Sequence, residues 1–358
     1  MQQIDFSQGS IRRRILAVAT PMLIAQLLNL LYNIVDRIYI GKIPGEGTLA
    51  LASIGLCFPF VTLITAFANL FGLGGAPLCA MARGKGNRNG AQGIMVNAGF
   101  MLLLSGAVLT VLGIAFHRPL LYLFGASEVT YPYASSYIVI YLIGTLCVML
   151  SLGLNPYINC QGFARTGMLT VALGAAANIV LDPIFIFALH LGVRGAAIAT
   201  VLSQLLSAAW VVKFLTGKKA ELKLDFRGFR PDCQCIQRIT VLGIASFVMS
   251  FTDTLVQVAC NATLRNFGGD LYISVMTVLN SVRQIAQTPV LAIADGASTA
   301  ISYNYGAGLY RRTRDAIRFM TQIAIGYTML VWILVSLFPA LFIRIFNQDA
   351  ELVAAAVP

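Results

Sequence analysis

Charge is scarce in this sequence. Only 11% of the 358 residues are charged, whereas 58% are hydrophobic, and an ordinary soluble domain is about one quarter charged. This shortage excludes a soluble globular domain and indicates an integral membrane protein. The apolar residues come in long runs rather than in the ~10-residue alternating segments of a β-barrel, which predicts an all-α fold.

Motifs of nucleotide, zinc and protease chemistry are also missing. The glycine-bearing loop at Gly84-Lys-Gly86 has no Ser or Thr after its Gly-Lys pair, so it is a turn and not a phosphate-binding loop. Cys233-x-Cys235 lacks the two-residue gap and the second ligand pair of a zinc site. Phe267-Gly-Gly-Asp270 departs from the Gly-x-Gly-Asp motif of an intramembrane aspartyl protease at its first position. We therefore expect no enzyme and no cofactor.

The apolar runs are long enough to cross a membrane as helices, since about 20 residues span the hydrocarbon core. They cover approximately residues 15–40, 49–73, 93–116, 133–159, 168–191, 196–215, 239–264, 271–305 and 319–343, and a tenth begins near Val353.

The basic residues between these runs predict the orientation. With the N-terminus placed in the cytoplasm, eighteen Lys and Arg fall on the inside and six on the outside, and Arg283 is left within a helix. This bias follows the positive-inside rule. The net charge of +11 therefore reflects membrane topology, and nucleic acid is excluded as a partner.

An internal repeat appears when the sequence is compared with itself at an offset of 222 residues. Gly84-Lys-Gly86 then falls on Gly306-Ala-Gly308, and Phe116 falls on Phe338. The offset covers six helices, an even number, which predicts two parallel six-helix lobes related by an axis along the membrane normal.

The predicted lobes have the following bounds. Residues 1–215 form the N-terminal lobe, 216–237 a cytoplasmic loop that acts as a solvated tether, and 238–358 the C-terminal lobe with helices 7–9 and the start of helix 10. The second lobe is incomplete in this chain, and a completed repeat predicts a protein of roughly 440 to 460 residues.

Four acidic residues lie inside the apolar segments: Asp36, Asp182, Asp253 and Asp295. An ionisable group in the membrane marks a functional site by default. Asp36 and Asp182 each lie late in a helix that runs outward, and Thr200 lies early in one that runs inward. We expect these three to converge in the outer half of the N-terminal lobe.

Asn178 is the fourth member of this predicted site. It precedes Asp182 by four residues, so the two share a helix face, and Pro183 weakens the backbone hydrogen bonding beside them. Carboxylates with amide and hydroxyl groups suit either a proton or Na⁺, the latter at Asp36 and Asp182. Pro21 interrupts the first helix, and we interpret it as a hinge, although a static kink remains equally open.

The remaining membrane charges have weaker assignments. Asp253, central in the seventh helix, is interpreted as a second site or a substrate counter-ion in the other lobe. Asp295 and Arg283 are twelve residues apart in the eighth helix, about 18 Å along its axis, too far for direct pairing. A gate or a helix-end contact is as consistent with Asp295 as a role in transport.

Several motifs together resemble the multidrug and toxic compound extrusion (MATE) family, in particular its MepA-like bacterial members. They are Tyr32-Asn-Ile-Val-Asp36-Arg-Ile-Tyr-Ile-Gly41, Gly74-Gly-Ala-Pro77, Cys160-Gln-Gly-Phe-Ala-Arg-Thr166 and Ala177-Asn-Ile-Val-Leu-Asp182-Pro183. The resemblance covers the whole chain and implies two six-helix lobes in a V that open alternately to the outside and the inside.

The resemblance also implies a function. It is that of a monomeric antiporter in the bacterial inner membrane, in contact with lipids, which exports organic cations or amphipathic drugs in exchange for H⁺ or Na⁺. The coupling ion would bind at Asp36, Asn178, Asp182 and Thr200. The alternative is a flippase for lipid-linked oligosaccharides or other lipids, whose cavity we would expect to be basic. Arg283 is the only base expected to be buried here.

Overall fold

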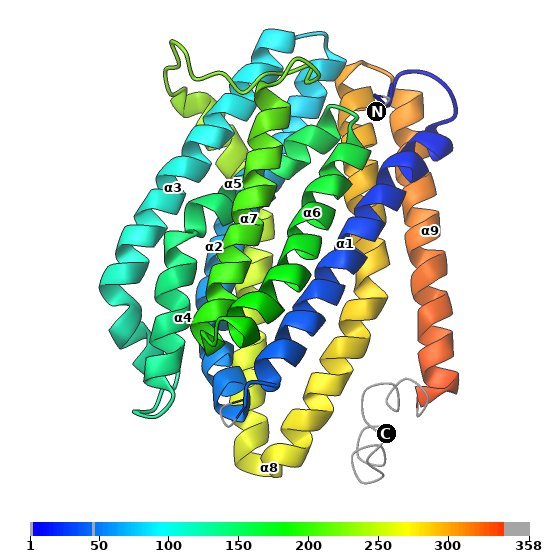
Figure 1. Cartoon of the computed structure of the whole chain (residues 1–358). Helices are drawn as coiled ribbons and strands as arrows, with labels where there is room; N and C mark the ends of the chain where they lie inside the picture. The colour runs from blue at the N-terminus through cyan, green and yellow to red at the C-terminus, as the bar shows by residue number, and fades with distance from the viewer. Residues whose placement is uncertain (1–2, 45–46, 340–358) are drawn as a thin grey trace.

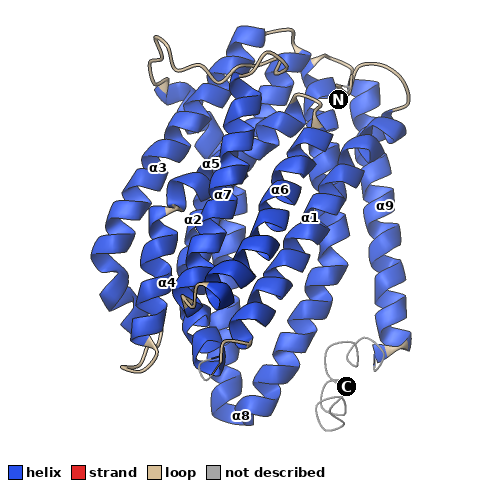
Figure 2. Cartoon of the chain, viewed as in Figure 1, coloured by secondary structure: helices blue, strands red, loops and turns tan. Residues whose placement is uncertain are grey.

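A computed structural model describes residues 3–44 and 47–339. Within these ranges every regular element is a helix, and the remainder is loop (Figure 2). The all-α membrane fold predicted from the sequence is confirmed. The apolar segment expected near Val353 lies outside the described residues.

The helices follow one another along the chain in a bundle (Figure 1). They are α1 (Ile11–Gly41), α2 (Gly47–Gly84), α3 (Arg88–Leu123), α4 (Tyr131–Ile143), α5 (Thr145–Cys160), α6 (Ala164–Pro183), the π-helix η1 (Ile184–Ala188), α7 (Gly192–Thr216), α8 (Cys233–Gly306) and α9 (Tyr310–Leu337). Among the described residues, seven helices are long and apolar enough to cross a membrane, or eight if the bent pair α4–α5 is one span. We call the end of the bundle that holds the N-terminus the N-side, and the opposite end the far side.

One predicted span is broken. The apolar run at 133–159 forms α4 and α5, which meet at Gly144 with a bend of 56°. Gly144 packs against α7, where a β-carbon would lie 2.5 Å from the Cγ2 atom of Val201. The freed carbonyl of Leu142 accepts a hydrogen bond of 3.1 Å from Thr110, which stabilises the break.

Pro183 changes the helix type within another span. Proline has no backbone N–H and cannot continue the regular ladder, and the chain continues as the π-helix η1, in which the N–H of Leu189 donates to the carbonyl of Ile184 at 2.9 Å. Short π segments inside helices occur frequently at functional sites. Asp182 is the residue directly before this change of pitch.

The seventh and eighth apolar runs form one continuous helix. A loop between residues 264 and 271 was expected, but the backbone is helical throughout α8. Figure 1 shows that α8 turns back on itself at the far side, so that both of its ends lie at the N-side. The first limb contains Ile239 and Gly243, and the second contains Asp295 and Gly306. Gly268-Gly269 lies in this stretch, and glycines are among the residues at which helices bend sharply.

The internal repeat is visible in the packing of α2 against α8. A β-carbon on Gly84 would collide with the carbonyl oxygen of Tyr303, and one on Gly306 with the carbonyl oxygen of Met81. Gly84 and Gly306 are 222 residues apart, and so are Met81 and Tyr303. The two contacts are therefore equivalent by the repeat, as expected beside a twofold axis between the lobes.

The loop between α7 and α8 was expected to be a solvated tether, but it packs against the N-terminal lobe. Leu222 and Leu224 are buried, and the backbone N–H of Leu222 donates to Gln161 Oε1 at 2.8 Å. The carboxylate of Glu221 pairs with Arg83. The alternation of Leu with charged residues in this loop allowed one face to dock on the N-terminal lobe while the other remains in solvent.

We predict that Gly195→Ala destabilises the N-terminal lobe. A β-carbon there would lie 2.6 Å from the backbone carbon and oxygen of Phe185 in η1, and backbone atoms cannot move aside as a flexible side chain can. We expect a loss of about 1–3 kcal/mol in the free energy of unfolding, measured by thermal unfolding in detergent.

The matched control for this substitution is Gly93→Ala in α3, where a β-carbon would meet no atom within 4 Å. It should be neutral or stabilise by up to about 1 kcal/mol, because alanine favours a helix over glycine. Equal stabilities of the two variants would contradict the role given to Gly195.

Candidate functional site

Asp36 and Asp182 lie side by side in the far-side half of the bundle. Asp36 is near the end of α1, and Asp182 is near the end of α6. Their carboxyl groups are within hydrogen-bonding reach of one another, and Asp182 is completely buried. The sequence analysis expected these two residues to converge, and the structure brings them together.

Asn178 and Thr200 complete the predicted group. The side-chain amide of Asn178 donates to Asp182 Oδ1 at 3.2 Å, and it lies 3.5 Å from the hydroxyl of Thr200 on α7. One turn of α6 places Asn178 and Asp182 on the same face. The four residues named from the sequence therefore form one cluster contributed by three helices.

Three oxygens of this cluster have no hydrogen-bond donor among the residues that the structure describes. They are Oδ1 of Asp36, Oδ2 of Asp182 and Oδ1 of Asn178, and all three atoms are buried. Buried oxygens without a donor are costly, and two ionised carboxylates in contact repel each other. A proton shared by the two acids would remove the repulsion, and so would a small cation bound by the three oxygens. The three oxygens suit either a proton or a metal cation, because hard cations prefer oxygen ligands.

Two tyrosines belong to the site and were not assigned to it from the sequence. Tyr32 on α1 interacts electrostatically with both carboxyl groups, and the buried Tyr137 on α4 interacts with that of Asp36. Tyr32 could have been found, because it precedes Asp36 by one helical turn. Tyr137 could not, because only the tertiary fold brings α4 to α1.

Asn33, about one helical turn before Asp36 on α1, is not part of this cluster. It is exposed, and its side chain donates to the carbonyl of Asn29 at 2.6 Å on the same helix. Pro21 is buried inside α1, which continues through it without a break. The carbonyl of Ala17 therefore lacks its usual N–H partner in the helix. A hinge would require this, but a static kink at Pro21 would have the same missing hydrogen bond.

The charged residues assigned to the second lobe do not gather. Asp253 lies on the first limb of α8 with its side chain exposed. Asp295 is half-buried on the second limb, and Arg283 is exposed. Within the described residues the ion pair that forms is the one between Arg83 and Glu221, so Asp295 and Arg283 do not form a charged gate here.

The expectation that Arg283 is the buried base was wrong. The buried base is Arg83, whose side chain is only 7% exposed at the N-side end of α2. Arg283 is exposed on the second limb of α8. Arg83 was assigned to a loop in the sequence analysis, because the apolar run ends near residue 73 although the helix continues to Gly84.

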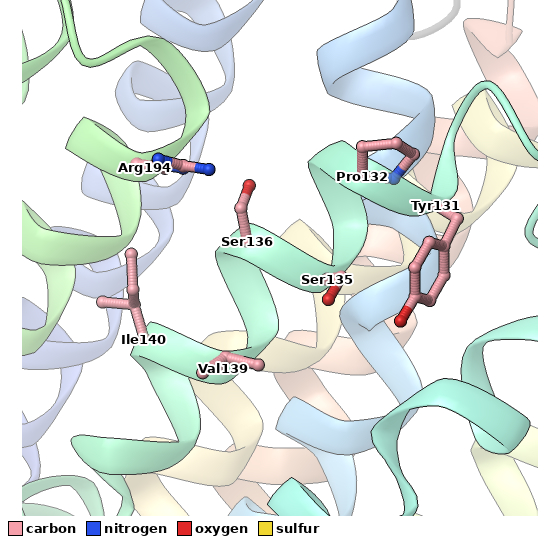
Figure 3. Close-up of a pocket in the computed structure, with 7 residues that line it drawn as sticks. All are labelled: Tyr131, Pro132, Ser135, Ser136, Val139, Ile140 and Arg194. Carbon is pink, nitrogen blue, oxygen red and sulfur yellow. The ribbon is translucent and has the colours of Figure 1, made fainter.

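An open depression of about 550 Å³ lies beside α4, with Arg194 of α7 at its rim (Figure 3). It is lined by Tyr131, Pro132, Ser135, Ser136, Val139, Ile140 and Arg194. None of the four membrane acids lines it. A positive charge at the rim repels cations, so this depression is not the place where the acid cluster would receive one.

Comparison with known sequences identifies the family. The MatE family model matches residues 21–184 and 245–358, more than half of the chain. The multidrug export protein MepA of Staphylococcus haemolyticus is 24% identical over 356 residues, which cover 99% of this chain and 78% of that protein. MepA of Staphylococcus saprophyticus is 22% identical over 351 residues, covering 98% and 77%.

Solved structures agree with this match. An outward-facing multidrug resistance MATE transporter of the MOP superfamily superposes with a TM-score of 0.91 at 24% identity, covering 100% of this chain and 79% of that one. A MATE transporter in complex with MaD3S gives a TM-score of 0.91 at 25% identity, covering 100% and 80%. These matches confirm the two-lobed fold and the resemblance read from the residues, and the chain therefore belongs to the MatE family of membrane transporters.

Proposed function

We propose that this protein is a secondary antiporter that exports organic compounds, often cationic or amphipathic, in exchange for H⁺ or Na⁺. The relatives named multidrug export proteins support the direction and the class of substrate. The observation that carries the coupling mechanism is the contact between the carboxyl groups of Asp36 and Asp182, each with one buried oxygen that lacks a donor within residues 3–44 and 47–339.

The coupling ion would bind between α1 and α6. When Asp36 and Asp182 are both ionised, their repulsion favours separation of the two helices, and a proton or Na⁺ removes this repulsion. Asn178 holds one oxygen of Asp182 in place and offers its own free oxygen to a cation. The bound and the empty states then favour different arrangements of α1, which is what alternating access requires.

The orientation belongs to the same proposal. The basic loops between α2 and α3 and between α7 and α8 both lie at the N-side (Figure 1). By the positive-inside rule the N-side is cytoplasmic, in a bacterial cell membrane, and the far side with its acid cluster faces outward. An acid cluster nearer the outside can take up a cation that enters down its gradient.

The organisation into lobes completes the proposal. Residues 1–215 act as the N-terminal lobe, 216–237 as the interlobe loop, and 238–358 belong to the C-terminal lobe. Asp253 on α8 serves there as a counter-ion for organic cations, and the protein works as a monomer in contact with lipids.

We predict that Asp182→Asn and Asp36→Asn each reduce efflux of ethidium from cells at least tenfold. The amide cannot exchange a proton and is a weaker cation ligand than a carboxylate, although it has nearly the same shape. Membrane insertion should be unchanged, as judged from the amount of protein in isolated membranes. Asp225→Asn in the interlobe loop is the control, since that carboxylate is exposed and accepts a local bond from the backbone N–H of Arg227. Normal efflux from either cluster variant would exclude the coupling model.

The coupling ion can be identified in everted membrane vesicles. We expect either an imposed proton gradient or an imposed sodium gradient, but not both equally, to drive uptake of the exported compound. The active gradient should lose its effect in Asp182→Asn. Uptake that needs neither gradient would contradict antiport.

Asp253→Asn tests the counter-ion assignment. We predict that cationic compounds compete for binding about tenfold less well, because a charge-assisted contact is lost, and that neutral compounds compete as before. Asp315→Asn on α9, another exposed acid, is the matched control. If the affinity for every cation stays the same, Asp253 has no part in substrate binding.

A further inference from the structure

The first residues of the chain cross from one lobe to the other at the N-side. The N–H of Ile4 donates to the carbonyl of Gly162, next to α6, at 3.0 Å. Two residues later the carbonyl of Phe6 accepts bonds from Arg312 of α9 at 3.1 Å and from Asn304 of α8 at 3.3 Å. We call residues 3–10 the strap, and Figure 1 shows it beside the N-side ends of α8 and α9.

Phe6 anchors the strap between the lobes. Its side chain is only 1% exposed and belongs to a small apolar cluster with Ala164 of α6 and with Ala300 and Ala316 of α8 and α9. Its ring centroid lies 5.7 Å from that of Tyr303. Burial of one aromatic side chain contributes stability only while both lobes supply its walls, so this contact is lost when the N-side ends separate.

A buried ion pair lies directly beneath the strap. Arg83 donates to the carboxylate of Glu221 and to the carbonyl of Cys160, and its guanidinium lies 5.6 Å from the ring centroid of Tyr303 in the other lobe. Gln3 of the strap donates to the same carboxylate at 2.6 Å. The strap, the interlobe loop and the two lobes therefore meet at one charged cluster.

The turn of the strap is stabilised by Asp5. The backbone N–H and the hydroxyl of Ser7 donate to its carboxylate at 2.8 and 2.6 Å. These bonds lower the pKa of Asp5, and the positive charges of Arg14 and Arg312 act in the same direction. The carboxylate is therefore ionised at neutral pH, and the turn that presents Phe6 persists.

We propose that the strap and the Arg83–Glu221 pair form a latch that holds the N-side ends of the two lobes together. The latch rests on alternating access, as put forward above, because a carrier must separate these ends before a compound can enter from this side. The latch encloses the point where Gly84 and Gly306 bring the backbones of α2 and α8 into contact. It consists of one aromatic side chain, one ion pair and a few hydrogen bonds, so it is weak enough to open reversibly.

The latch can be tested by pulse EPR on the protein in liposomes. Spin labels are attached through Lys85→Cys and Arg311→Cys, two exposed positions on opposite lobes at the N-side, after the native cysteines that react with the label have been replaced by serine. We expect Phe6→Ala and Glu221→Gln each to raise the ratio of separated to closed populations about tenfold. Phe6→Ala removes a side chain that packs on both lobes, and Glu221→Gln weakens the ion pair that holds Arg83 against Tyr303 of the other lobe.

Two matched variants control for general effects of the substitutions. Phe226→Ala removes an aromatic side chain of the interlobe loop that packs on Phe229, and Glu128→Gln removes a far-side carboxylate that accepts from Tyr122. Both should leave the distance distribution unchanged. Glu221→Gln keeps the shape of the side chain, so its distance distribution tests the latch even if Phe6→Ala does not fold.

Unchanged distances in Glu221→Gln would overturn the latch, and so would an equal shift in the controls. The measurement needs no transport, so its result is independent of the coupling mechanism. Normal efflux by Asp182→Asn with a shift in Glu221→Gln would refute the coupling site alone. Coupled efflux with unchanged distances would refute the latch alone.

Discussion

Two carboxyl groups that face each other inside the membrane impose the main physical constraint on this protein. Asp182 is completely buried, and the side-chain amide of Asn178 donates a hydrogen bond to it. Asp36 reaches it from another helix. Such a pair is tolerated only if protons or cations enter and leave it, or if the surrounding helices hold it in place. The helices around it are held closely, since α7 packs against η1 through Gly195 directly after Asp182 and Pro183.

The glycine contacts between α2 and α8 follow the internal repeat, whereas Asp36 does not. At the N-side, Gly84 and Gly306 make equivalent contacts with the opposite lobe, and the relation extends further along the helices. Gly74 packs on the backbone of Gly243, and Gly296 packs on Ala19 of α1, close to the repeat equivalent of Gly243 at Pro21. Duplicated glycines fix how closely the lobes approach. Asp36 has no duplicate, because its repeat equivalent is Val258, so the glycine contacts follow the repeat and this acid does not.

The sequence predicted the acid cluster because its signals are local. Asn178 and Asp182 share a helix face by their spacing, and the direction of each span gave the depth of Asp36 and Thr200. The same reasoning failed where tertiary contacts decide. The second span was ended near residue 73 at its run of glycines, although the helix continues to Gly84 through buried residues such as Ala76, Cys79 and Ala80, and so Arg83 was missed as a buried base. The docked interlobe loop and the bend at Gly144 likewise depend on partners far away in the sequence, Gln161 and Val201.

The two ends of α1 connect the acid cluster with the latch. Asp36 lies near its far-side end, and the strap enters its N-side end at Ile11, about 38 Å away along a helix of 1.5 Å rise per residue. A rigid helix would move both ends together, whereas a helix with a hinge at Pro21 could uncouple them. Pro21 lies two residues from Ala19, where the backbone of Gly296 holds α1 against the second lobe. The close contact at Ala19 can therefore act as a pivot, and the helix can bend beside it, where Pro21 weakens the backbone hydrogen bonding. A change of charge at Asp36 that tilts the far-side part of α1 would then act on the strap through this pivot, and the proline determines how much of the tilt is transmitted.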